Sequence, residues 1–205
     1  MPRPFERGEY DNRFRNTCLA NHSSVGGIFD GRAPLRHGGV RTPIDVDEIA
    51  RLLQIEVTEH ADPGAANTIG KITLSHEGPA RVWINPAENA YGPRRRFTLA
   101  HEIAHFCMHR STDRHEFIDD KSTMNRSESY WNSYESEANR FAAELLMPQQ
   151  LIESLGRRVI DAYKAEHNTE KMPLTRFIDV MAVKFRVSHL AMEFRLRNVG
   201  IGKHK

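Results

Sequence analysis

The stretch Phe97-Thr98-Leu99-Ala100-His101-Glu102-Ile103-Ala104-His105 decides how this sequence is interpreted. Two histidines stand four positions apart, and a glutamate directly follows the first. Residues i and i+4 of an α-helix lie about 40° apart around the axis, so both imidazoles would face one ion. The glutamate lies about 100° from the first histidine, within reach of water beside that ion, as a general base requires. We therefore predict a metal site on a helix.

The alternative to a metal site is a pair of histidines that simply pack in the core. The chain has 11 histidines, and so short a pattern also arises by chance. Ile103, Ala104 and Phe106 make the segment apolar enough to be buried. Because desolvation disfavours unpartnered polar groups, a buried histidine pair needs partners. This context favours the metal site over two core histidines.

Composition limits the class of protein. The chain has 205 residues, which suits one domain with a substantial core, and 29 Lys+Arg against 27 Asp+Glu leave a net charge of only +2. That balance argues against a surface built for nucleic acid or membrane. Two cysteines are too few for a disulfide framework, and the sequence has neither a long apolar run nor a signal peptide. We expect a cytoplasmic protein.

The order of predicted elements indicates an α+β fold. Residues 1–40 combine glycines and arginines without periodicity, so we expect an irregular or flexible segment, followed by a single domain over 41–205. The patterns predict a mainly helical, zincin-like core, with a small antiparallel sheet of about three strands beside the histidine-bearing helix and a C-terminal helical module at about 150–200. Expected helices cover 45–53, 93–109, 133–146 and 149–167, then a final pair; expected strands cover 55–58, 69–75 and 80–85; 111–131 is expected to be a long loop.

A third metal ligand is needed, because a catalytic zinc usually has three protein ligands and one open position. The predicted helix 133–146 carries several carboxylates. Glu135 shares its face with small residues that would let another helix approach closely, so Glu135 is the candidate third ligand. Glu137 is the alternative, although it is expected to face solvent or a surface arginine. Asn139, one turn after Glu135, could orient a histidine through a hydrogen bond.

At these residues the chain resembles the ImmA/IrrE family of metallopeptidases, relatives of the thermolysin-like zincins. The resemblance is carried by Arg96 to His105 with His109 one turn on, by Glu135 to Pro148, and by the upstream helix Pro43 to Ala50. It implies a metallo-endopeptidase whose zinc is bound by the three residues His101, His105 and Glu135, with Glu102 as the catalytic base.

The resemblance also implies site-specific cleavage of a cytoplasmic regulatory protein, such as a helix-turn-helix repressor or an antitoxin-like partner. Asn139 departs from the aspartate that thermolysin-like enzymes carry there, and an amide orients a histidine more weakly than a carboxylate does. Residues 1–40 lack the two helical periods of the helix-turn-helix domain that many family members carry.

Several alternatives stay open at this level. The chain could be a metal-containing regulatory module that sequesters a partner with little peptidase activity. Mn²⁺ is an alternative to Zn²⁺, since imidazoles and a carboxylate accept both. The strand 80–85 could present a free edge to a substrate backbone or be an ordinary internal strand.

Three further questions concern individual residues. Tyr130, Tyr134 and His115 are candidates for stabilising an oxyanion. His109 could be a substitute ligand, although support of the site or packing is favoured. The final helix pair is interpreted as a packing module rather than a DNA-binding one. The sequence does not indicate the oligomeric state of the protein.

Overall fold

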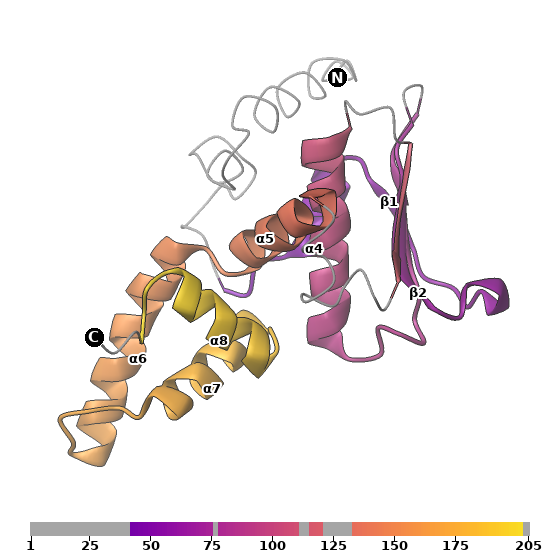
Figure 1. Cartoon of the computed structure of the whole chain (residues 1–205). Helices are drawn as coiled ribbons and strands as arrows, with labels where there is room; N and C mark the ends of the chain where they lie inside the picture. The colour runs from indigo at the N-terminus through magenta and orange to yellow at the C-terminus, as the bar shows by residue number, and fades with distance from the viewer. Residues whose placement is uncertain (1–41, 76–77, 111–114, 121–132, 203–205) are drawn as a thin grey trace, which may run out of the picture.

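The computed structural model describes residues 42–75, 78–110, 115–120 and 133–202. Its fold is α+β, as predicted, with one sheet beside a long helix and a helical C-terminal part (Figure 1). The expected irregular segment at 1–40 lies outside the described residues. No helix in the described part combines the length and apolarity needed to cross a membrane.

The sheet has four strands in the order β1-β3-β2-β4. β1 (Glu56–Thr58) runs parallel to β3 (Arg81–Ile84), whereas β2 (Thr68–Thr73) runs antiparallel to both β3 and β4 (Glu116–Asp120). The sheet is therefore mixed, not purely antiparallel as expected. β3 lies inside the sheet, so of the two alternatives left open for this strand the structure supports the ordinary internal strand and not the free edge.

β4 is the element that the sequence analysis missed, because it lies within the segment 111–131 that was expected to be a loop. Its burial alternates: Phe117 and Asp119 are buried, and Ile118 between them is exposed. That two-residue period is the mark of a strand with one buried face, but five residues amid charged neighbours gave too short a signal. β4 forms one edge of the sheet.

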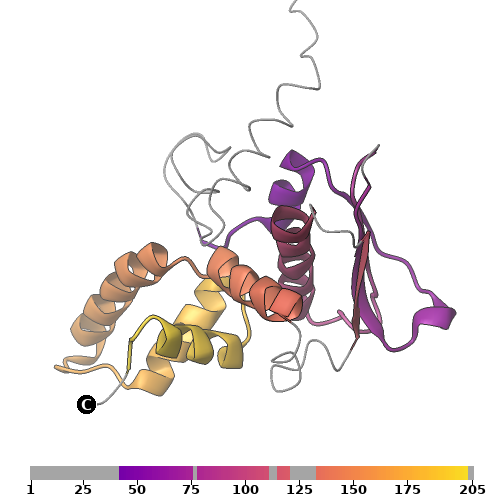
Figure 2. The same cartoon turned by 45° about the horizontal axis from the view of Figure 1, so that its top comes forward.

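The helices agree closely with the predicted ranges. Their bounds are α3 Val46–Leu52, α4 Gly92–His109, α5 Ser133–Leu146, α6 Gln149–His167, α7 Leu174–Phe185 and α8 His189–Asn198, with one turn of 3₁₀ helix at Pro63–Ala65. α4 lies beside the sheet, α5 packs across α4, and α6 to α8 gather on the side away from the sheet (Figures 1 and 2).

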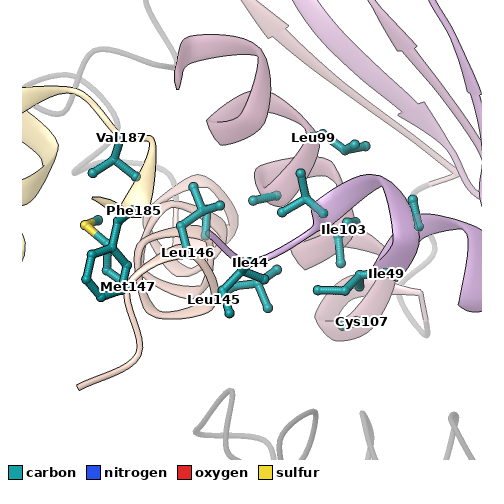
Figure 3. Packing of buried hydrophobic residues seen from close by; sticks show 14 of the residues in the cluster. Ile44, Ile49, Leu99, Ile103, Cys107, Leu145, Leu146, Met147, Phe185 and Val187 are labelled. Atoms are coloured by element: carbon teal, nitrogen blue, oxygen red, sulfur yellow. The ribbon is translucent and has the colours of Figure 1, made fainter. Parts of the chain in front are cut away.

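Side chains from α3, α4, α5 and α7 form one continuous apolar core (Figure 3). Ile103 and Cys107 of α4 face this core with Leu145 of α5, and all three are almost fully buried. The same core reaches Phe185 at the end of α7. The final helix pair thus contributes side chains to the packed interior, as the packing interpretation expected. Because this core fixes the apolar face of α4, it also determines the direction of the opposite face of the helix.

Arginines in the first turn of α4 hold α3 in place. Arg95 pairs with Asp47, at 2.7 Å, and with Glu59, at 2.5 Å. Arg96 donates a hydrogen bond to the backbone oxygen of Ile44, at 2.8 Å. These contacts compensate the unfavourable placement of cations at a helix N-terminus. They also position α4 relative to the chain that precedes it.

Gly70 of β2 lies directly against α4. A Cβ atom added there would stand 2.7 Å from both Glu102 Oε1 and Thr98 Cγ2. We expect Gly70→Ala to lower the free energy of unfolding by about 1–3 kcal/mol, because the packed helix must move to accept the methyl group. Urea unfolding measures this. Gly92→Ala is the matched control, since nothing lies within 4 Å of its added Cβ, and equal stability of the two variants would contradict the prediction.

Candidate metal centre

α4 presents the two motif histidines and the glutamate to the interior. His101, Glu102 and His105 have no exposed surface. The Nε2 atoms of the two histidines lie 3.0 Å apart, as their four-residue spacing predicts. The helix therefore brings two imidazole nitrogens to one point.

Glu135 joins this point from α5, as the sequence analysis predicted. Its Oε2 atom lies 3.0 Å from His101 Nε2 and 3.6 Å from His105 Nε2, and the residue is 3% exposed. The small residues of α5, Ala138 and Ala142, are fully buried, which fits the close approach of α5 to α4. A carboxylate and two imidazoles from two helices thus converge.

Asp119 of β4 is the fourth group, and the sequence analysis did not predict it. Its Oδ2 atom lies 3.0 Å from His101 Nε2, the same distance as the Glu135 oxygen. Asp119 has no exposed surface, and neither of its oxygens accepts a hydrogen bond from the described residues. Its alternation with buried Phe117 was the one available signal for an inward-facing acid.

The donor set fits a divalent cation. One ligand atom from each of His101, His105, Asp119 and Glu135 lies within 4.8 Å of all the others. Imidazole nitrogen and carboxylate oxygen are both common ligands of Zn²⁺. The carboxylate oxygens of Glu102 are also buried without a hydrogen-bond partner. Such burial of acids is costly unless a positive charge compensates them, and a bound cation would supply that charge.

The titration of the site residues reflects this crowding. Burial lowers the pKa of His101, but the carboxylates of Asp119 and Glu135 outweigh burial and raise it to about 10. Burial by itself would raise the pKa of Glu135, but the hydrogen bonds from the two histidines hold that pKa below the ordinary value. Burial, reinforced by the negative charge of Asp119, raises the pKa of Glu102 well above its ordinary value. Burial lowers the pKa of His105.

Asn139 orients the first histidine. Its Oδ1 atom lies 3.1 Å from His101 Nδ1, so the ring N–H donates to the amide oxygen. In the neutral form of His101, that bond leaves Nε2, which faces the cluster, as the nitrogen available to a metal. The role suggested for Asn139 from its helical position agrees with this contact.

A chain of two contacts orients the second histidine. His109 Nε2 lies 3.2 Å from Glu137 Oε2, and His109 Nδ1 lies 2.9 Å from His105 Nδ1. If His109 donates to the carboxylate, its Nδ1 accepts from His105, and His105 Nε2 is then free to bind a metal. Glu137 thus contacts a histidine while 46% of its side chain stays exposed, so the expectation that it faces solvent was correct only in part.

Aromatic rings enclose the histidine row. Phe117 stacks on His105 with ring centroids 4.2 Å apart, and Tyr134 packs edge-on against His109 at 4.8 Å. Tyr134 is thus placed beside His109, while His115 is exposed. Tyr130 lies outside the described residues. The role of an oxyanion donor stays a prediction for all three.

The helix motif and its converging acids define a candidate metal-binding site of the kind found in HExxH peptidases. The chain belongs to the Peptidase_M78 family, whose model, described as the IrrE N-terminal-like domain, matches residues 55–197. This match confirms the resemblance to the ImmA/IrrE family. The comparison with curated proteins finds no match.

We predict that His109→Phe weakens metal binding about 10- to 100-fold, the scale reported when a partner of a ligating histidine is removed. Phenylalanine keeps the ring packing against Phe117 and Tyr134 but removes both nitrogen atoms. Competition with a chromogenic chelator measures the affinity, and thermal unfolding checks that the variant folds. His167→Phe, on exposed α6 surface, is the control. Unchanged affinity in the His109 variant would show that this histidine only packs.

Proposed function

We propose that the chain is a zinc-dependent metallo-endopeptidase. The observation that carries the proposal is Glu102, a buried carboxylate without a hydrogen-bond partner that stands next to the four candidate metal ligands. A residue that only stabilised the fold would not be expected there without a partner. Membership of a peptidase family supports the same conclusion.

In this proposal His101, His105 and Glu135 hold the metal, and Glu102 is the general base. A bound Zn²⁺ would lower the pKa of a water molecule and polarise the peptide carbonyl. Glu102 accepts the proton of the attacking water and then donates it to the leaving amine nitrogen. Its raised pKa suits the first step, because a carboxylate whose pKa lies above the ordinary value accepts a proton more readily. Asn139 and His109 keep the imidazoles in the required tautomers.

The proposed substrate is a cytoplasmic regulatory protein of the repressor or antitoxin type. Support comes from the family resemblance, in which such proteins are the usual partners. We favour Zn²⁺ over Mn²⁺ because the two imidazole donors suit zinc, whereas oxygen-rich sites suit manganese.

We expect Glu102→Gln to reduce the rate of peptide-bond cleavage about 10²- to 10⁴-fold, the usual contribution of a positioned general base. The variant should retain its metal, because Glu102 is not among the proposed ligands. Zinc-loaded protein is incubated with a panel of purified repressors and antitoxins, mass spectrometry identifies new termini, and metal analysis is run in parallel. Glu153→Gln, an exposed substitution on α6, is the control.

Two outcomes would count against this function. Equal cleavage by the wild type and Glu102→Gln would show that the glutamate is not the base. Stable binding of a partner without cleavage by either protein would favour the sequestering module instead.

A further inference from the structure

We propose that Asp119 is a fourth protein ligand that closes the metal site, and that strand β4 acts as a latch holding it there. The proposal rests on the proposed function and deepens it by naming how the site is controlled.

The position of Asp119 matches that of Glu135. Both carboxylates place an oxygen 3.0 Å from His101 Nε2, and they come from different elements, β4 and α5. Both are buried, at 0% and 3% exposure. Yet Asp119 accepts no hydrogen bond in the described structure, whereas Glu135 does. A buried carboxylate that lies so close to an imidazole nitrogen without accepting a hydrogen bond is in the position of a metal ligand.

The number of ligands decides what such a site can do. Catalytic zinc sites have three protein ligands and an open fourth position, whereas sites with four protein ligands are closed. With His101, His105 and Glu135 bound, Asp119 fills the fourth position of a tetrahedron. Neither water nor a substrate carbonyl can then enter, so the described conformation is latent.

Asp119 faces inward through the same two-residue alternation that buries Phe117, and an irregularity in the sheet lies directly beside it. The β2–β4 register shifts between the pairs Thr68↔Asp120 and Gly70↔Asp119. Such irregularities redirect side chains and are common beside active sites. The absence of a Cβ at Gly70 leaves room for Glu102 at the same point, since an added Cβ would lie 2.7 Å from its Oε1. Gly70, the β2 partner of Asp119, therefore leaves space for the α4 acid beside the β4 acid.

The position of β4 in the fold would allow this strand to leave the sheet and carry Asp119 away from the metal site. Among the described strands, the five-residue edge strand β4 pairs only with β2, so its removal leaves the β1-β3-β2 ladder intact. Phe117 is its buried apolar anchor, stacked on His105. A polypeptide that paired with the freed edge of β2 would restore the lost backbone hydrogen bonds. The extended segment of a protein substrate has that chemistry, so substrate binding and opening are coupled.

Metal binding tests the ligand role without reference to peptidase activity. Cobalt-loaded wild type, Asp119→Ala, Asp119→Asn and Asp120→Ala are titrated with azide while the visible spectrum is recorded. The wild-type spectrum should not change, because no position is open, whereas the Asp119→Ala spectrum should. Asp119→Ala should also bind zinc at least about tenfold more weakly in chelator competition. Asp120→Ala removes a charge one residue away and should behave as wild type.

Asp119→Asn keeps the shape of the side chain and guards against a folding defect in the alanine variant. Wild-type zinc affinity in both Asp119 variants, or an azide response in the wild type equal to theirs, would overturn the ligand role. Failure of the wild type to bind metal would remove both this inference and the proposed function.

Hydrolysis tests the latch. In zinc-saturated protein, Asp119→Ala should cleave a peptide faster than the wild type, whereas Glu135→Ala should lose activity. Loss of activity in both variants would reduce Asp119 to an ordinary site residue and overturn the latch. The azide and zinc experiments could give the expected results while no protein hydrolyses the peptide. That outcome would contradict the proposed function and the latch but would leave the four-ligand site supported.

Discussion

The compensation of buried negative charge is the constraint on which this structure depends. Three carboxylates, those of Glu102, Asp119 and Glu135, meet two imidazoles in a volume that is almost fully shielded from solvent. Such a group of acids is unfavourable in an apolar interior unless cations or hydrogen bonds balance it. The donor geometry, the unpartnered oxygens and the shifted pKa values are all consequences of this one requirement.

α4 meets that requirement by having two different faces. One face, with Ile103 and Cys107, packs in the apolar core against α3 and α5. The other carries the histidines, whose orientation is then fixed because a packed helix cannot rotate. The arginine contacts at its first turn and the close approach of Gly70 restrict it further. The packed core therefore fixes the positions of the side chains at the site.

The two histidines are supported from different sides. An amide on α5 orients His101, and a second histidine with a partly exposed carboxylate orients His105. α5 therefore contributes to the site three times, through Glu135, Glu137 and Asn139. Glu135 and Asn139, one helical turn apart, both contact His101, whereas Glu137 contacts His109 further along α4. The antiparallel sheet pair β2–β4 contributes the remaining acid from the opposite side.

The sequence alone determined the local features. Helical periodicity fixed the spacing of His101 and His105, selected the inward face of Glu135 and placed Asn139 one turn away, because these depend only on the geometry of one helix. The helix ranges followed from the same periodicity and from capping residues such as Asp45, whose side chain caps α3. Tertiary structure decided what depends on neighbours distant in sequence: the internal position of β3, the contact of Glu137 with a histidine, and the inward place of Asp119. A strand of five residues carries too little pattern to reveal its pairing partner, and only the packed sheet brings its acid to the metal centre.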